Sequence, residues 1–264
     1  MSEKNAWQKF KDRLKWLDPF TYVDLYLMPK LNPSGNKITE WIVYIASAFV
    51  FALIFYSAAG FLLGTTTPLV VVVSGSMEPN LYRGDVILLQ GVSGEQLKAP
   101  EIQLNYPTLK GIPVNSFAES FCSGSLSQDL IACDSYKQAY IQGKAGLEDF
   151  RVEKIFFDEK NILGVKKEGD IVVYNSDRGI PVIHRAIAKL KAQDGFYILT
   201  KGDSVKNPLI DQDTSLSLYP VQVKELQGKS IFRIPLIGYV KLILFDDLSV
   251  LLFGCPYEQG CILP

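Results

Sequence analysis

Three short stretches of the sequence contain side chains that could do covalent chemistry. Ser74 and Ser76 flank a glycine directly after a run of valines, and the chain's one histidine, His184, lies in "PVIHRAIA". A third stretch, "TKGDSVKNPLIDQD", carries Asp203 and Asp211. Each stretch alone is weak evidence for a catalytic role, because polar turns have similar compositions and a lone histidine in a strand is more often structural. Together they supply a hydroxyl nucleophile, an imidazole base and carboxylates to orient the base, which is the set that acyl transfer by a serine enzyme needs.

The segments that carry these residues predict an antiparallel β domain. Short runs rich in valine and isoleucine, such as "LVVVV", "DVILLQ", "DIVVYN", "FYILTKG" and "SIFRIP", are separated by Gly, Asn and Asp. Such runs favour antiparallel strands over a βαβ arrangement. Strand alternation places Val182, His184 and Ala186 on one face, with Ile183 and Arg185 on the other.

The rest of the chain divides into an anchor, a leading segment and an insertion. Residues 41–63 carry no charge, and a helix of that length crosses a hydrocarbon core of about 30 Å, so we expect a transmembrane helix there. Residues 1–40 are predicted to be a cytoplasmic segment, containing either an amphipathic helix on the membrane or a short helix packed on its neighbours. Residues 64–264 are expected to form the extracytoplasmic β catalytic domain. Residues 91–165, polar and rich in Ser and Gln, are predicted to be an insertion in it.

Basic residues near the helix predict its orientation. Lys30 and Lys37 precede it, and no Lys or Arg follows until Arg83, which favours a cytoplasmic N-terminus in a single-pass protein of the cell membrane. The four cysteines all lie beyond the helix, as the pairs 122/133 and 255/261. Close pairs suit disulfides in an oxidising compartment, although unrelated buried thiols remain an alternative, above all for the first pair. The apolar residues 236–254 are interrupted by charges and fit an interfacial or core segment better than a second crossing.

Composition argues against two classes of partner. The chain has 27 basic and 28 acidic residues, and nucleic-acid binders carry clustered positive charge, so we expect no nucleic acid. One histidine and these cysteine spacings supply no set of four metal ligands. We therefore expect no metal and no cofactor.

The order of the motifs and the residues in them resemble those of a known family. "SGSMEP" followed by "RGDV", then "GDIVVYN", "VIHRAIA", "TKGDSVKNPLIDQ" and "GKSIFRIPLIGYV", is similar to the signal peptidase I family of serine peptidases, in its archaeal and endoplasmic-reticulum branch with a Ser-His-Asp site. The likeness covers about residues 41–90 and 166–240. It implies a mainly β fold of signal peptidase type, and a membrane-bound serine endopeptidase that cleaves signal peptides from secretory precursors.

The resemblance also implies a role for each candidate residue. Ser76 corresponds to the nucleophile and Ser74 to the hydroxyl that steadies the oxyanion together with the Ser76 backbone N–H. His184 stands where the bacterial branch has a lysine. A histidine, with an ordinary pKa of about 6.5, can act as a base near neutrality without the desolvation that a lysine needs.

The acidic positions depart from the usual pattern of the family. Asp203 and Asp211 match them, and we favour Asp211 as the residue that orients His184. Ser204 replaces a common asparagine after the Gly-Asp pair, and extra residues separate the two aspartates. Asp213 therefore stays an alternative.

The substrate and the partners follow from the same resemblance. An extended signal peptide could add as a strand beside residues 69–73, with Met77 and Ile183 as predicted pocket residues. We expect precursors that bear signal peptides, membrane lipid and the protein translocation channel as partners. Two other functions stay open: a processing protease with a narrow set of clients, and a non-catalytic family member that binds precursors or belongs to a translocation complex.

Overall fold

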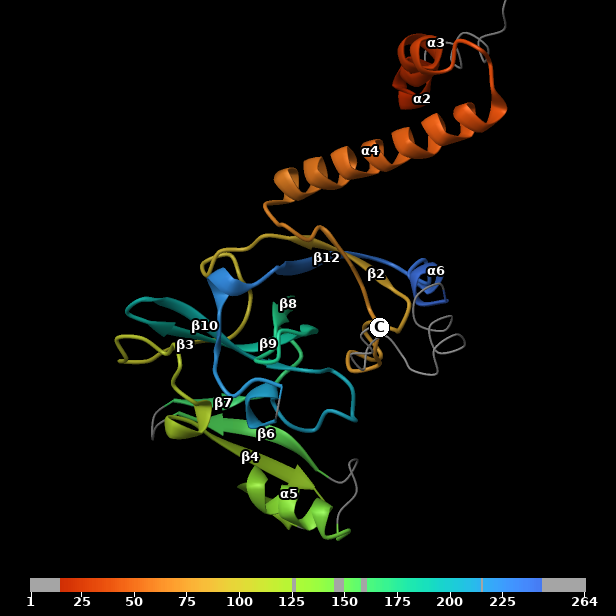
Figure 1. Cartoon of the computed structure of the whole chain (residues 1–264). Coiled ribbons are helices and arrows are strands. Elements are labelled where there is room, and N and C mark those ends of the chain that lie inside the picture. Colours follow the sequence, from red (N-terminus) through yellow and green to blue (C-terminus); the bar gives the residue numbers. More distant parts are fainter. Residues whose placement is uncertain (1–14, 125–126, 145–149, 158–160, 215, 244–264) are drawn as a thin grey trace, which may run out of the picture. The chain divides into compact units, whose positions relative to one another are not determined.

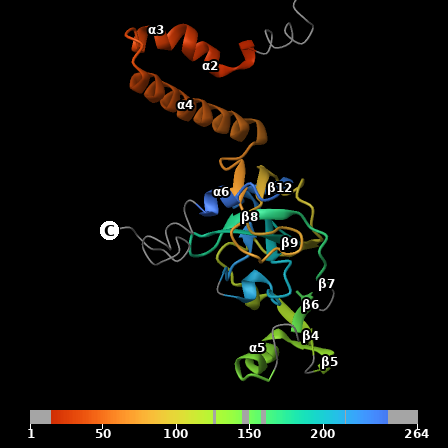
Figure 2. The same ribbon diagram turned by 90° about the vertical axis from the view of Figure 1, so that its right-hand side faces the viewer.

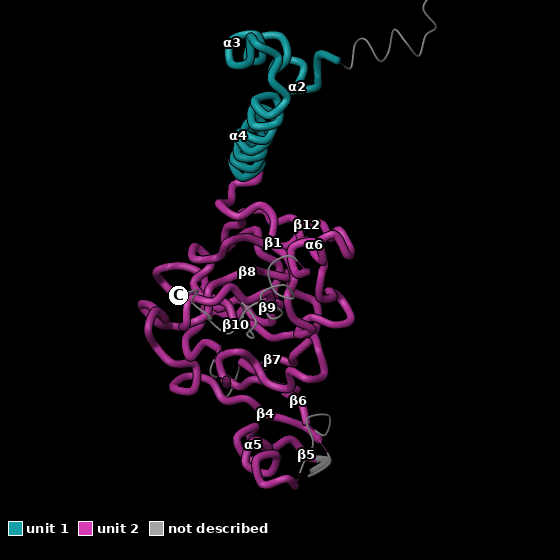
Figure 3. The backbone as a smooth tube through the Cα atoms, turned by 45° about the vertical axis from the view of Figure 1, so that its right-hand side comes forward, with its two compact units in different colours: residues 1–62 teal, residues 63–264 magenta. Residues whose placement is uncertain are grey.

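The computed structural model divides the chain into two compact units, residues 1–62 and residues 63–264, which Figure 3 draws in teal and magenta. The residues that the structure describes are 15–124, 127–144, 150–157, 161–214 and 216–243. Each unit is described by itself.

The first unit is helical. Its elements are the single turn η1 (Lys15–Leu17), α2 (Pro19–Tyr22), the π-helical turn η2 (Val23–Leu27), α3 (Met28–Leu31) and α4 (Lys37–Leu63). The predicted amphipathic helix rests on the helical spacing of Trp7, Phe10, Leu14 and Leu17. Of these only Leu17, in η1, lies among the described residues.

Helix α4 contains the predicted transmembrane segment and begins four residues before it, at Lys37. Asn36 caps its first turn, because the Asn36 side chain accepts a hydrogen bond of 2.8 Å from the Ile38 N–H. Gly64, with a φ of +64°, follows its last residue, a conformation that commonly ends helices. The most apolar part of α4 has a mean hydropathy of 2.2, and α4 is the one helix among the described residues long and apolar enough to cross a membrane.

The second unit is built on a sheet of eight strands, which we call the main sheet. Seven of them follow the order β1-β2-β12-β8-β9-β10-β11 with antiparallel neighbours, and β3 pairs parallel with β9. The strands are β1 (Leu69–Val71), β2 (Val86–Gln90), β3 (Glu101–Gln103), β8 (Ile171–Asn175), β9 (Pro181–Ala192), β10 (Gly195–Lys201), β11 (Val221–Gln222) and β12 (Gly228–Ile234). The prediction of a mainly antiparallel β domain with one N-terminal apolar helix is confirmed.

A second sheet of four strands has the order β5-β4-β6-β7. Its elements are β4 (Glu119–Gly124), β5 (Ser127–Ala132), β6 (Phe150–Phe156) and β7 (Ile162–Gly164), and the helix α5 (Cys133–Ile141) follows β5. Within the unit, this sheet lies at the opposite end from β12 (Figures 1 and 2). It falls inside residues 91–165, but β3, also in that range, belongs to the main sheet. The boundaries of the insertion stay a prediction.

Short helical turns complete the second unit, namely η3 (Val114–Ser116), η5 (Asp211–Asp213), η6 (Val223–Glu225) and α6 (Tyr239–Leu242). One hydrophobic cluster joins the two sheets, because Tyr136 and Ile155 from the second sheet region are buried with Leu190 and Leu199 of the main sheet. A second sheet this small gains its stability by sharing the core of its neighbour.

Candidate active site

The predicted base and one predicted acid meet inside the main sheet. His184 lies in β9 opposite Val172 of β8, and Asp211 begins η5. Asp211 Oδ2 is 2.7 Å from His184 Nδ1, and the two side chains are only 2% and 3% exposed, respectively. Val182 and Ala186 are buried like His184, as strand alternation predicts.

Tyr174 of β8 is a second partner of Asp211, and sequence reasoning missed it. Its hydroxyl donates a hydrogen bond of 2.8 Å to Asp211 Oδ2 and accepts one of 3.2 Å from Thr200. Burial, together with the charge of Asp211, raises the pKa of Tyr174 well above its ordinary value, so the phenol stays protonated. The signal was present in "GDIVVYN", where Tyr174 and Val172 share the buried face of one strand.

These contacts decide which ring nitrogen of His184 is free. An ionised carboxylate can only accept hydrogen bonds, so Asp211, which accepts one from Tyr174, accepts another from Nδ1–H of His184, and Nε2 keeps its lone pair. The turn that holds Asp211 is itself fixed, because Gln212 exchanges hydrogen bonds of 3.1 and 3.3 Å with the backbone and hydroxyl of Thr200. The pair is therefore arranged so that Nε2 can act as a base.

The two predicted serines lie in the loop between β1 and β2. Ser74 Oγ and Ser76 Oγ are 3.3 Å apart, with Ser74 exposed and Ser76 half-buried. The Ser76 carbonyl accepts a hydrogen bond of 2.9 Å from the Ser204 N–H. Gly202 permits this approach, because a Cβ on Gly202 would stand 2.7 Å from that carbonyl oxygen. None of the hydrogen bonds of Ser76 reaches His184 in the described structure, and such bonds are often long before substrate binds.

Asp203, the other predicted acid, does not contact His184. Its carboxylate accepts hydrogen bonds from Arg185 Nε at 2.9 Å and Nη2 at 2.6 Å, and from Asn80 Nδ2 at 2.7 Å. Burial opposes its ionisation, but the hydrogen bonds and charge of Arg185 outweigh burial and hold the pKa of Asp203 below its ordinary value. Because Arg185 follows His184 and Asn80 lies in the serine loop, Asp203 ties the base strand to that loop.

Comparison with known proteins finds relatives of the chain. No family model matches it. It is 35% identical over 100 residues to the catalytic subunit of the signal peptidase complex of Fusarium vanettenii, a match that covers 36% of this chain and 56% of that protein. The subunit of the same name from Yarrowia lipolytica is 23% identical over 221 residues, 82% of this chain and 88% of the relative. Catalytic subunits of the signal peptidase complex are therefore relatives of this chain, in agreement with the resemblance of its motifs.

The match to the Fusarium protein and to others of similar identity is partial. The aligned part of the chain spans about 56% of the length of those relatives, and the match to the protein of Verticillium alfalfae, 36% identical over 100 residues, has the same extent. The longer alignment to the protein of Clavispora lusitaniae, 23% identical over 220 residues, covers 86% of that relative. The activity, substrates and partners of this chain are therefore matters for a proposal.

The third predicted aspartate, Asp213, has no hydrogen bond to His184 in the described structure. Asp213 lines a cavity of about 800 Å³, together with Cys133 and Asp134. Its Oδ2 is buried without a hydrogen-bond partner, and burial raises the pKa of Asp213. The alternative in which Asp213 orients His184 has no contact to support it in the described structure.

The two predicted pocket residues have different surroundings. Met77 is fully buried in a cluster with Ile87 and Val173, so a contact with substrate would require that cluster to open. Ile183 is half-buried and packs on the same cluster. The residue after Ser76 and the residue before His184 therefore share one hydrophobic cluster. The substrate role of Met77 and Ile183 stays a prediction.

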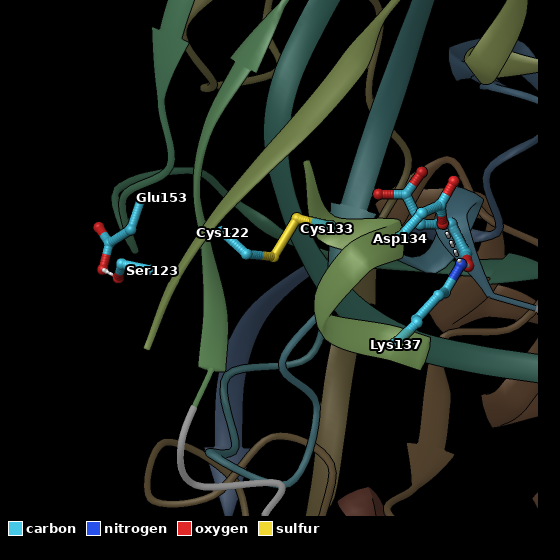
Figure 4. Close-up of a disulfide and its surroundings, with 7 residues drawn as sticks. Cys122, Ser123, Cys133, Asp134, Lys137 and Glu153 are labelled. Atoms are coloured by element: carbon cyan, nitrogen blue, oxygen red, sulfur yellow. Dashed lines mark hydrogen bonds and ion pairs between the residues drawn. A yellow bond between two sulfur atoms is a disulfide. The ribbon is translucent and has the colours of Figure 1, made fainter. Parts of the chain in front are cut away.

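One of the two predicted cysteine pairs lies among the described residues. A disulfide joins Cys122 of β4 to Cys133 at the start of α5 (Figure 4), whereas Cys255 and Cys261 lie outside the described residues. Among the described residues, no group of three or more His, Cys, Asp or Glu side chains could hold a metal ion.

Proposed function

We propose that this chain is a membrane-bound signal peptidase that removes signal peptides from secretory precursors through a serine acyl-enzyme. The observation that carries the proposal is the buried pair of His184 and Asp211, beside a serine loop that Asp203 ties to the histidine strand. Relatives named as the catalytic subunit of the signal peptidase complex support the same reading.

The proposed reaction begins at Ser76. His184 Nε2 takes the proton of Ser76 Oγ, which attacks the carbonyl carbon of the scissile peptide bond. Asp211 holds the ring through Nδ1–H and stabilises the imidazolium that forms. The Ser74 hydroxyl and the Ser76 backbone N–H donate hydrogen bonds to the oxyanion.

Collapse of the tetrahedral intermediate breaks the C–N bond. His184 gives its proton to the leaving amine, which is the new N-terminus of the mature protein, and the signal peptide stays on Ser76 as an ester. Water then attacks this ester with His184 again as the base, which releases the signal peptide with a free carboxylate and restores Ser76.

The substrate is proposed to bind as an extended strand. Among the described strands β1 ends the order of the main sheet, so its outer edge could pair with a further strand. β1 lies between α4 and Ser76, and the segment from Leu63 to Ser76 spans at most about 45 Å when fully extended. A signal peptide that emerges from the membrane would therefore meet Ser76 near the surface.

The proposed setting is a membrane. Helix α4 would span it once with the N-terminus in the cytoplasm, which places residues 64–264 on the extracytoplasmic side of the cell membrane. Precursor proteins, membrane lipid and the protein translocation channel are the proposed partners. Because the relatives are named as subunits of a complex, we also propose that this chain acts with further subunits.

Cleavage of a precursor by the full chain in detergent tests the function. The substrate is a precursor with a small-x-small signal peptide, and wild type is compared with Ser76→Ala and His184→Ala. We expect both variants to be silent, whereas Ser230→Ala, which removes another half-buried serine hydroxyl of the second unit, cleaves like wild type. A folded wild type that cleaves none of several precursors would overturn the proposal in favour of a narrow set of clients or a non-catalytic role.

A further inference from the structure

A second cavity, of about 210 Å³, is lined in part by Asp203 and is rich in basic residues. The basic residues among those that line it are Arg151, Lys166, Lys167 and Lys201. They come from β6, from the segment before β8, and from the end of β10. Segments distant in the sequence thus bring four positive charges to one small space.

The carboxylates of this cavity are already engaged. Glu153 accepts hydrogen bonds from Arg151 at 2.7 Å and from Ser123 at 3.0 Å, and Asp203 is paired with Arg185, which is not among the lining residues. Lys166 is exposed and lies 3.7 Å from Glu168. The positive charges of the cavity that have no carboxylate partner among the described residues are therefore those of Lys167 and Lys201.

Among the described residues, Lys167 Nζ and Lys201 Nζ donate hydrogen bonds only to backbone carbonyls. Lys167 Nζ donates to the Asp203 carbonyl at 2.6 Å, and Lys201 Nζ donates to the carbonyls of Gly202 at 2.9 Å and Asn207 at 2.6 Å. Within the described part of the chain, neither ammonium group has a carboxylate at ion-pair distance. An ammonium has three N–H donors, so both keep at least one donor for a ligand.

Such a cluster is costly without a counter-ion. Desolvation disfavours an isolated ion, and this cost falls mainly on Lys201, because Lys201 is half-buried whereas Lys167 is exposed. The cost is visible at Lys201, where burial and the charge of Lys167 lower the pKa to about 8. An anion between the two lysines would remove both the unpaired charge and the repulsion.

We propose that this cavity binds an oxyanion, a carboxylate or a phosphate group, between Lys167 and Lys201. The site adjoins the candidate active site, because Gly202 and Asp203 line the cavity and the next residue, Ser204, holds the Ser76 carbonyl. The anion has two possible sources, which are a free inorganic ion and an acidic side chain of a bound precursor. The second source rests on the proposed function.

Binding of inorganic phosphate to the full chain in detergent tests the site. We would titrate at constant ionic strength and pH 7, with isothermal calorimetry or the ³¹P linewidth as the readout. Lys167→Gln and Lys201→Gln should each weaken binding at least about tenfold, because each removes a charged donor. Lys154→Gln is the matched control, since Lys154 lies in the same strand as Arg151 and is exposed outside the cavity.

Two outcomes would overturn the site. One is the same phosphate affinity in wild type and in both cavity variants, and the other is no binding by wild type up to about 10 mM phosphate. If Lys201→Gln does not fold, Lys167→Gln decides alone, because Lys167 is exposed and tolerates substitution more readily.

The pH dependence gives an independent readout. Phosphate binding by wild type should weaken as pH rises through about 8, where Lys201 loses its proton. Lys167, Arg151, Asp203 and Asp211 also act on this ammonium, and their charges persist near pH 8. The same loss near pH 8 in Lys201→Gln would contradict the assignment.

A pair of peptides separates the two sources. Ser76→Ala protein would be offered precursor peptides that differ only by Asp or Asn at one position after the cleavage site. A preference for the Asp peptide that disappears in Lys167→Gln assigns the site to a precursor carboxylate, and equal binding of both peptides assigns it to a free anion. If the chain cleaves no precursor, the proposed function is wrong, but the measured phosphate affinity of the cavity still tests the anion site.

Discussion

The main sheet and the second sheet hold their charged side chains in different surroundings. In the main sheet, the pairs of His184 with Asp211 and of Arg185 with Asp203 are almost wholly buried. In the second sheet region, the pair of Lys137 with Asp134 is exposed, and a disulfide replaces buried ion pairs as the cross-link (Figure 4). Burial fixes the orientation of a charged group, which chemistry requires, while a covalent bond secures a sheet with little core of its own.

The two regions meet at the turn that carries the proposed catalytic acid. Lys137 of α5 donates a hydrogen bond of 2.6 Å to the carbonyl of Asp213, two residues after Asp211 in η5. The disulfide holds the first residue of the same helix. The second sheet region therefore supports η5 from outside, whereas Tyr174 contacts Asp211 from within the main sheet.

The largest expected effect is that of Asp211→Asn on catalysis. An amide in place of the carboxylate would favour the wrong tautomer of His184, so kcat should fall by about 10³- to 10⁴-fold while KM changes little. Steady-state cleavage kinetics measure this, with the thermal melting curve as a check on folding. A variant within tenfold of wild type would show that burial of this pair serves structure alone.

The second effect is that of Asp203→Ala on stability. Removal of this carboxylate leaves the largely buried Arg185 without its partner, so the free energy of unfolding should fall by about 3 to 5 kcal/mol. The exposed Asp134→Ala is the control from the second sheet region and should change stability by less than about 0.5 kcal/mol. Urea unfolding of both variants measures the contrast, and equal losses would contradict it.

Asp203 also predicts a dependence of stability on pH. Its pKa in the folded chain is lowered, so its contribution is fully present above the unfolded value of about 3.9 and is lost as pH falls through that value toward the folded pKa. Unfolding midpoints between pH 6 and pH 3 should therefore decline less steeply in Asp203→Asn than in wild type. An identical acid slope in the two proteins would mean that other carboxylates dominate.

Loss of the disulfide should have a smaller and more local effect. The bond closes a loop with a sequence separation of 11 residues, so Cys122→Ser with Cys133→Ser should cost about 2 to 3 kcal/mol. Hydrogen exchange should rise in β4 and α5 and stay unchanged in β8 and β9. Exchange that rises equally in both sheets would show that the two regions unfold together.

The smallest effect is expected for Lys137→Met on the proposed activity. This change removes the hydrogen bond to the Asp213 carbonyl, but Gln212 still fixes the turn, so kcat should fall about two- to tenfold. Lys137→Arg, which keeps a donor, should restore most of the rate. A change in KM without a change in kcat, or a Lys137→Arg variant as slow as Lys137→Met, would argue against a positioning role.

Local patterns in the sequence determined much of this protein. Some features depend only on residues that are neighbours in the sequence, so they can be predicted before the fold is known. They are the uncharged stretch of α4, the strand alternation around His184 and the turns that contain glycine. The motif resemblance likewise selected Ser76, His184, Asp203 and Asp211, because the types of side chain and their order are properties of the chain alone.

Only the tertiary structure decided which of these side chains meet. Asp211 lies 27 positions from His184 in the sequence, and Asp203 lies 18 positions from Arg185. The structure shows that Asp211 contacts the histidine, whereas Asp203 ties two segments together. Tyr174, Lys137 and the unpaired lysines of the second cavity gain their surroundings in the same way. The physical reason is that hydrogen bonding, burial and pKa depend on which distant strands pack together, and local sequence periodicity carries no record of that packing.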